Sequence, residues 1–155
     1  MDNTFGIIRT TRRNFLRLVD ELSEEQLNTI PVSFNNNIGW NFGHIIVIQQ
    51  TLCYIRMGFK SRISPALATR FAKGSKPQQQ ITQEETAFFK AELMAQIDKL
   101  ESDLQSGSFE GRQYEKLSTS YGIDINSLED SIHYLATHDA LHYGYALAQR
   151  KAAGF

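Results

Sequence analysis

The sequence predicts an all-α fold, a four-helix bundle with long crossover connections, in a single domain that spans residues 1–155. Apolar residues recur at helical spacing in four long segments, and no two segments show the strict alternation of paired strands. The only three prolines, Pro31, Pro65 and Pro77, fall between these segments, where helix breakers are expected. A chain of 155 residues is also long enough to bury a full-sized core.

The first predicted helix runs from Thr4 to Leu22. Its apolar stripe consists of Phe5, Ile8, Phe15, Leu16, Val19 and Leu22. Arg12 falls inside this stripe, and we expect its stem to lie along the core while the guanidinium reaches water. The alternative is that Arg12 holds an anion near a functional site. The segment Ser23–Gln26 then has the pattern of a capping box, which predicts a short helical turn that Pro31 ends.

The second predicted helix, Ile38 to Met57, is apolar over most of its circumference and should therefore be central. Its solvent-exposed side is predicted to consist of Gln49, Gln50 and Arg56. The residues that share the face of His44 are Trp40, Asn41, Val47, Ile48, Thr51 and Ile55. Cys53 lies ~180° around the axis from His44, so we expect a buried structural thiol and no part in the same site.

A long connection over residues 58–81, with a short helix from Pro65 to Ala72, can carry the chain along the bundle or cover a site. A second capping box, Thr82–Glu85, opens the third helix, which ends near Gln105. Its apolar face is Phe89, Leu93, Ile97, Leu100 and Leu104, and it is interpreted as scaffold. The polar, glycine-marked loop over residues 107–126 leaves room for a short hairpin.

The last predicted helix, Ser127 to Arg150, carries two histidines four residues apart, His138 and His142. This spacing places both on one face of the helix. The other residues of that face are Ser131, Tyr134, Leu135, Leu141, Tyr145, Ala146 and Gln149. Because this stripe is mostly apolar, we expect it to face the core. Tyr134 and Tyr145 are interpreted mainly as packing or oligomer contacts, and the alternative is that they hydrogen-bond a metal-bound water. Two buried imidazoles need polar partners, and a divalent metal would satisfy both.

A third histidine, His44, lies on the inner face of the central helix, whereas His133 lies ~140° from His138 and should be on the surface. Three histidine ligands leave a coordination position open, which is the pattern of catalytic metal sites. The spacing is equally consistent with core histidines that are hydrogen-bonded to tyrosine or backbone. Asp139 replaces the glutamate of the His-Glu-x-x-His motif. We expect Asp139 to pair with a surface cation; the alternative is that it orients a histidine ligand.

Composition argues against several partners. The formal charge of −1 gives no general attraction to nucleic acid or anionic lipid. No run approaches the ~18 apolar residues of a membrane span. One cysteine excludes an internal disulfide, and the polar start Met1–Thr4 lacks the features of a signal peptide. A cytoplasmic protein is therefore expected.

Three motifs, in their order and separation, resemble the DinB/YfiT-like family over nearly the full chain. They are Leu22-Ser23-Glu24-Glu25-Gln26-Leu27, Gly39-Trp40-Asn41-Phe42-Gly43-His44-Ile45, and His138-Asp139-Ala140-Leu141-His142-Tyr143-Gly144 before the basic Arg150-Lys151. The resemblance implies a four-helix bundle with a long crossover, a nickel or zinc ion on His44, His138 and His142, and a homodimer. Relatives include transferases that use low-molecular-weight thiols, isomerases and hydrolases. Tyr145 departs from the glutamine that relatives often carry. The family's historical link to DNA damage does not by itself imply DNA binding.

The leading hypothesis is therefore a divalent-metal-dependent enzyme that acts on a small molecule, by thiol S-transfer or by hydrolysis. The rival hypothesis is a non-catalytic stress-response or binding module whose metal is structural or incidental. DNA binding is a third hypothesis, which the charge supports poorly.

Overall fold

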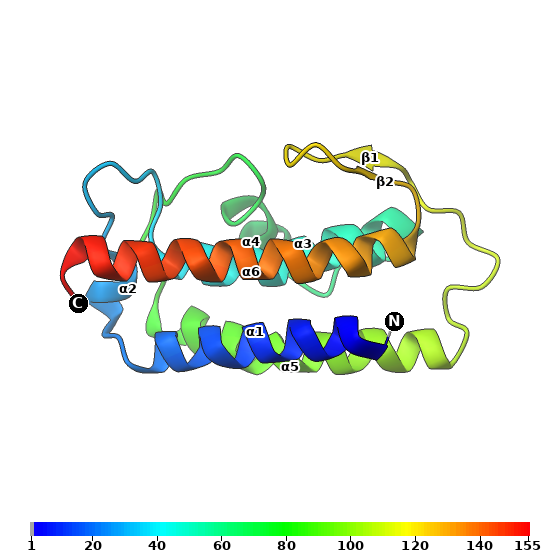
Figure 1. Ribbon diagram of the computed structural model, residues 1–155, viewed down its shortest axis with the longest axis horizontal. Coiled ribbons are helices and arrows are strands. Elements are labelled where there is room, and N and C mark those ends of the chain that lie inside the picture. The colour runs from blue at the N-terminus through cyan, green and yellow to red at the C-terminus, as the bar shows by residue number, and fades with distance from the viewer. Residues whose placement is uncertain (1) are drawn as a thin grey trace.

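The computed structural model describes residues 2–155, and its regular structure is helical apart from one two-stranded hairpin, as the sequence predicts. Four long helices lie side by side in Figure 1: α1 (Asp2–Asp20), α3 (Ile38–Gln49), α5 (Gln83–Gln105) and α6 (Leu128–Ala153). Helices α1 and α3 each pack against both α5 and α6. No helix in the described residues is both long and apolar enough to cross a membrane.

The predicted helix starts are confirmed by their caps. The side chain of Ser127 accepts a hydrogen bond from the backbone of Asp130 at the start of α6. Thr82 forms the predicted capping box with Glu85 at the start of α5, and Ser23 forms one before the short helix α2 (Glu24–Asn28). Each cap satisfies backbone N–H groups that have no partner inside the helix.

The central helix departs from the prediction after Gln49. The chain continues as a π-helix, η1 (Gln50–Tyr54), and then as a 3-10 turn, η2 (Ile55–Met57). A π-turn holds more residues than an α-turn, so the side chains that follow are displaced by one position. Arg56 consequently lines a cavity on the His44 side of the helix, while Ile55, expected there, is 42% exposed.

The predicted solvent-exposed side of this helix is also wrong, because Gln49 and Gln50 are buried. The Gln49 amide donates to the backbone carbonyl of Gln96 at 2.8 Å, and the Gln50 side chain accepts from the backbone of Arg62 at 3.0 Å. These hydrogen bonds offset part of the cost of burying the two amides, although Oε1 of Gln49 has no hydrogen-bond partner among the described residues. Sequence periodicity treats glutamine as polar and therefore places it outside.

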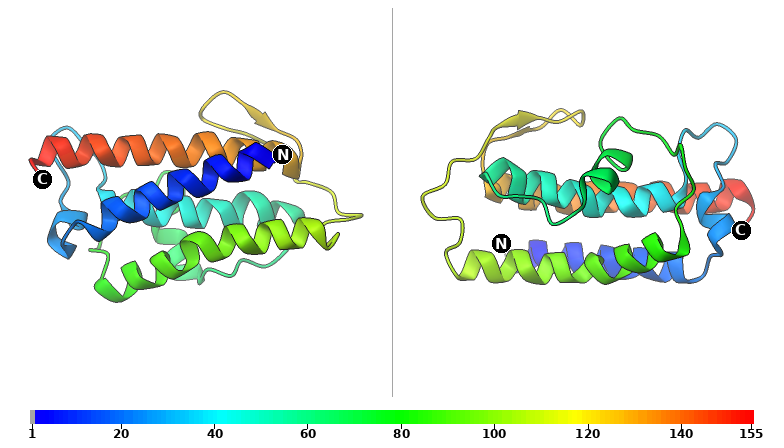
Figure 2. Two further views of the ribbon diagram at one scale, coloured as in Figure 1. Left: turned by 60° about the horizontal axis from the view of Figure 1, so that its bottom comes forward. Right: turned by 180° about the vertical axis from the view of Figure 1, so that it is seen from behind.

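Two connections lie on the side of the molecule that α3 and α6 form (Figures 1 and 2), and the first also contacts the start of α5 through the ion pair of Arg70 and Glu85. The first contains the short helix α4 (Pro65–Arg70). The second contains the antiparallel strands β1 (Leu117–Ser118) and β2 (Asp124–Ile125), which form the hairpin for which the sequence leaves room. Together with α3 and α6 they surround the candidate site.

The core consists of two apolar clusters with a polar layer between them. Each long helix contributes one buried polar side chain to this layer: Arg12, Gln49, Gln96 and Asp139. On α6, for example, Ala146 belongs to one cluster and Leu135 to the other, with Asp139 between them. The predicted burial of Cys53 is confirmed, and it belongs to the cluster of Leu135.

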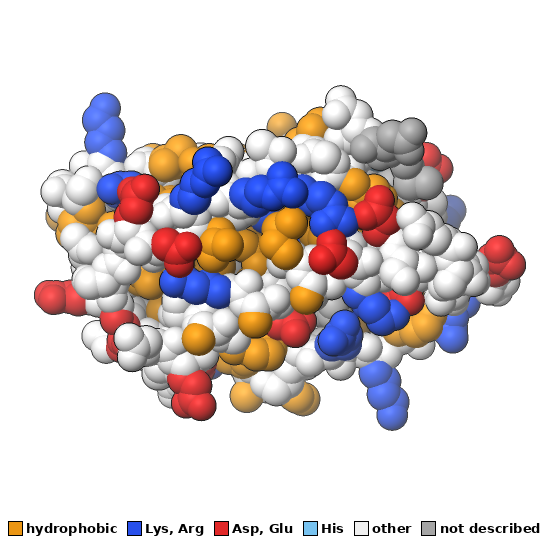
Figure 3. Space-filling model, turned by 90° about the horizontal axis from the view of Figure 1, so that it is seen from below, with side chains coloured by type: hydrophobic (Ala, Val, Ile, Leu, Met, Phe, Trp, Pro, Cys, Tyr) orange, Lys and Arg blue, Asp and Glu red, His pale blue; other side chains and the backbone are white. Residues whose placement is uncertain are grey.

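The face formed by α1 and α5 carries intermixed charges of both signs (Figure 3). Ion pairs join the two helices there: Arg9 pairs with Asp98 and Glu101, and Lys90 pairs with Asp20. Such exposed pairs contribute little stability, of order 0–1 kcal/mol each.

Candidate metal centre

Three histidines from two helices converge on one point. His44 comes from α3, and His138 and His142 come from successive turns of α6. The ring centroids lie 5.2 Å apart for His44 and His138, 4.6 Å for His44 and His142, and 4.5 Å for His138 and His142. One nitrogen from each ring lies within 4.8 Å of the other two. His133 is exposed, as predicted. The structure therefore brings together the three histidines that the sequence selected.

Two of these rings have a protein acceptor at Nδ1. His44 Nδ1 lies 2.6 Å from the backbone carbonyl oxygen of Phe71, and His142 Nδ1 lies 2.7 Å from Oδ1 of Asn41. The Asn41 oxygen is identified because its Nδ2 donates to the carbonyl of Asn37 at 2.9 Å. Both acceptors require Nδ1 to carry the proton, so the lone pair of Nε2 stays free. Metal-binding histidines have this arrangement.

The third ring is next to a buried ion pair. Asp139 Oδ1 lies 3.6 Å from Nδ1 of His138, and Asp139 Oδ2 accepts from Nε of Arg12 at 2.7 Å. Arg12 also donates to the backbone carbonyl of Leu93 at 2.8 Å. Oδ1 of Asp139 and Nδ1 of His138 are both buried and have no hydrogen-bond partner among the described residues.

The expected positions of Arg12 and Asp139 are therefore wrong. Arg12 does not reach water, and Asp139 does not pair with a surface cation, because both side chains are fully buried. Arg12 lies in the middle of α1, where a charged side chain is stable only with a buried counter-ion. The structure agrees better with the alternative given for each residue. Arg12 holds an anion, which is the Asp139 carboxylate, and this carboxylate faces His138.

The electrostatics keep the donor atoms available. Burial lowers the pKa of His44 to about 4, assisted by the neighbouring His138. Burial lowers the pKa of His142 to about 2, and His138 and His44 contribute. Burial by itself raises the pKa of Asp139, but Arg12 and His138 outweigh it, so the pKa lies below its usual value. At neutral pH, His44 and His142 are thus neutral imidazoles and Asp139 is an anion.

The histidines line the wall of a cavity of about 750 Å³ between α3, α6, the β1–β2 hairpin and the loop at Lys73. Its apolar and aromatic lining consists of Trp40, Ile48, Leu52, Leu117, Tyr121, Tyr134, Leu141 and Tyr145. A cavity of this size and character accepts a small organic molecule.

The predicted burial of Leu141 and Tyr145 is wrong, because they are 54% and 40% exposed. This face of α6 borders an open cavity and not a closed core, so its outer residues remain in contact with solvent. The ring of Tyr145 packs edge-on against Phe34, with ring centroids 5.1 Å apart.

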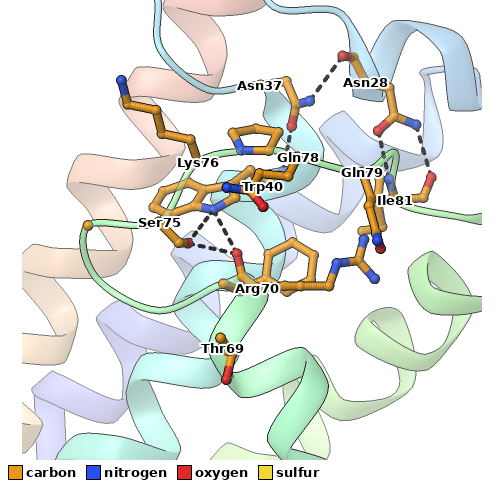
Figure 4. A pocket seen from close by; sticks show the side chains of 13 residues that line it. Asn28, Asn37, Trp40, Thr69, Arg70, Ser75, Lys76, Gln78, Gln79 and Ile81 are labelled. Carbon is orange, nitrogen blue, oxygen red and sulfur yellow. Dashed lines mark hydrogen bonds between the residues drawn. The ribbon is translucent and has the colours of Figure 1, made fainter.

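Trp40 separates this cavity from a smaller one of about 400 Å³, shown in Figure 4. Its indole stacks on the ring of His44, with centroids 4.5 Å apart. The indole N–H donates to the backbone carbonyl of Arg70 at 3.2 Å and to the hydroxyl of Ser75 at 3.1 Å (Figure 4). Trp40 therefore fixes both the His44 ring and the chain after α4.

Sequence reasoning missed three features of the site. Asn41 was assigned to the face of His44, but nothing in the sequence pairs it with His142. The carbonyl of Phe71 is a backbone group, which has no signal in the sequence. Arg56 reaches the cavity only because of the π-turn in η1, which periodicity does not reveal.

A comparison with protein-family models matches residues 7–146 to a family described as the DinB superfamily. The matched region contains all three histidines and most of each long helix. Among curated proteins, none matches the chain.

Proposed function

Because the chain belongs to the DinB superfamily, we propose that it is a metal-dependent enzyme that acts on a small molecule. His44, His138 and His142 would hold a divalent ion, zinc or nickel. The observation that carries this proposal is the convergence of three ring nitrogens within 4.8 Å at the wall of a cavity. The same family assignment leads us to propose a DinB-type four-helix bundle over residues 1–155 that functions as a homodimer. The composition leads us to propose a cytoplasmic location.

The residues present fit such an ion. Imidazole nitrogen is a preferred ligand of zinc and nickel, and His44 and His142 are held in the neutral form that can coordinate. Three protein ligands leave one position for substrate in a tetrahedral site. An ion on three neutral imidazoles keeps its full charge, so it would lower the pKa of a thiol or a water molecule that binds there.

The chain's own residues would orient the ligands. Phe71 and Asn41 hold the rings of His44 and His142, and Asp139 faces Nδ1 of His138. The apolar and aromatic walls of the cavity offer a surface on which the apolar part of a substrate can be buried. A thiol as nucleophile gives S-transfer to an electrophile, whereas water gives hydrolysis.

The rival proposal is a non-catalytic module in which the metal is structural. Structural zinc sites have four protein ligands. Within the described residues, the group of side chains able to share an ion contains three histidines and no cysteine or carboxylate. The group of three protein ligands, in place of four, and the adjoining cavity favour an enzyme over a module with a structural metal.

Metal content tests the site directly. The protein, purified without a histidine tag, is incubated with zinc or nickel, dialysed and measured by elemental analysis. We expect about one ion per chain in the wild type and in the matched control His133→Ala, whose side chain is exposed. His142→Ala should lose most of the metal, and full retention in that variant would exclude the site. A panel of electrophiles with low-molecular-weight thiols then separates the enzyme from the non-catalytic module.

A further inference from the structure

The cavity beside the histidines carries positive charge at its wall. Arg56 and Lys73 both line it, and among the described lining residues there is no aspartate or glutamate. Lys73 is exposed. The imidazoles of the lining carry no negative charge, so the formal charge of the lining is positive even without a metal ion. A ligand of opposite charge is therefore favoured.

Arg56 is placed at the cavity by the π-turn of η1 and is held by one end of its guanidinium. Nη1 lies 3.0 Å from the carboxylate of Glu115 and 3.4 Å from the carbonyl oxygens of Glu115 and Lys116. Within the described residues, no hydrogen bond involves Nη2 or Nε of Arg56. Two donors of a planar fork that suits carboxylate and phosphate groups are thus uncommitted.

The bond between Arg56 and Glu115 does not block this role. The Glu115 side chain is 73% exposed, whereas that of Arg56 is 25% exposed. An ion pair with so exposed a partner is weak. A ligand anion that enters the cavity can therefore bind the free edge of the guanidinium or replace the Glu115 carboxylate.

We propose that the cavity binds small molecules that combine an apolar body with an anionic group, that Arg56 recognises the anion, and that Lys73 adds positive charge at the cavity wall. Arg56 supplies the main contact because it is less exposed and can form two parallel hydrogen bonds. The aromatic and aliphatic walls hold the apolar body. This inference rests on the proposed function in that the same cavity adjoins the histidines, and it gives the charge class of the substrate.

The test uses metal-free protein, so it is independent of the metal proposal. The probes are 4-phenylbutyrate and its neutral counterpart 4-phenylbutanamide, at about pH 8, above the ordinary histidine pKa of about 6.5. Trp40 is the only tryptophan of the chain and lines the cavity, so its fluorescence reports binding. A charge-assisted hydrogen bond predicts about tenfold tighter binding of the carboxylate.

Three variants assign the selectivity to residues. Arg56→Gln should reduce the ratio of the two affinities to near one, and Lys73→Gln should reduce it less. Arg62→Gln is the matched control, because Arg62 is exposed and does not line the cavity, and it should behave as the wild type. Glu115→Gln removes the competing carboxylate and should tighten carboxylate binding, an effect that a merely structural role of Arg56 would not produce.

Equal affinity of the wild type for the two probes, or no binding of either, would overturn the proposal. Full selectivity in the Arg56→Gln, Lys73→Gln double variant would overturn it as well. Metal content is measured on the same preparations after loading with zinc. A protein that binds zinc but shows no charge selectivity refutes only this inference, and one that is selective but binds no zinc refutes only the proposed metal site.

Discussion

Replacing Asp139 by leucine should damage both stability and metal binding. Asp139 and Arg12 are fully buried and joined by a contact of 2.7 Å. Removal of one partner leaves an uncompensated charge in the core, which costs about 3–5 kcal/mol in free energy of unfolding. The change also removes the carboxylate that lies 3.6 Å from Nδ1 of His138. Loss of such a partner weakens metal binding about 10–100-fold.

A double variant separates the two effects. Arg12→Met combined with Asp139→Leu removes both charges, so stability in urea denaturation should return to within about 1 kcal/mol of the wild type or exceed it. Zinc affinity, measured by competition with a chromophoric chelator, should stay low because the carboxylate beside Nδ1 of His138 is still missing. Wild-type zinc affinity in the double variant would show that the ion pair has only a structural role. Wild-type stability of Asp139→Leu would refute the burial argument itself.

Three further predictions concern packing, pH and reactivity. A Cβ at Gly43 would lie 2.7 Å from the Phe71 ring, so Gly43→Ala should lower the free energy of unfolding by about 1–3 kcal/mol. A Cβ at Gly144 would meet no neighbouring side chain within 4 Å, so Gly144→Ala should leave that free energy unchanged or raise it by up to ~1 kcal/mol. Urea denaturation of the two variants and the wild type measures both effects. The metal-free protein should lose stability as pH falls from 6.5 to about 4, because folding lowers the pKa of His44 and the unfolded chain binds the proton more tightly. The contribution of His44 to this loss is on the order of 3 kcal/mol and is absent above pH 6.5. The total loss of stability should therefore be smaller in His44→Asn. A wild-type urea midpoint that does not change between pH 6.5 and about 4 would contradict the prediction. Burial raises the pKa of the Cys53 thiol, so Cys53 should react with a disulfide reagent only after unfolding; rapid labelling of the folded protein would be the opposite result.

Local signals in the sequence predict much of the fold. The capping residues Ser127 and Thr82 mark helix starts correctly because the interaction that stops fraying lies within four residues. The pair His138 and His142 is recognisable for the same reason, since helical geometry alone puts both on one face. His44 was found because it lies on the inner side of an almost wholly apolar helix.

Features that depend on distant partners could not be predicted in this way. Arg12 looks like a charge that must reach water until Asp139, 127 residues later, is seen beside it. Gln49 looks exposed until the carbonyl of Gln96 is placed against it. The position of Arg56 depends on a π-turn, which helical periodicity does not reveal.

X-ray absorption spectroscopy of the zinc-loaded protein tests the central claim most directly. The account predicts that the bound zinc has three imidazole nitrogens at about 2.0–2.1 Å. It also predicts that the imidazole signal falls in His44→Ala, while the His133→Ala spectrum matches that of the wild type. A spectrum without imidazole scattering, or one unchanged in His44→Ala, would contradict the three-histidine site.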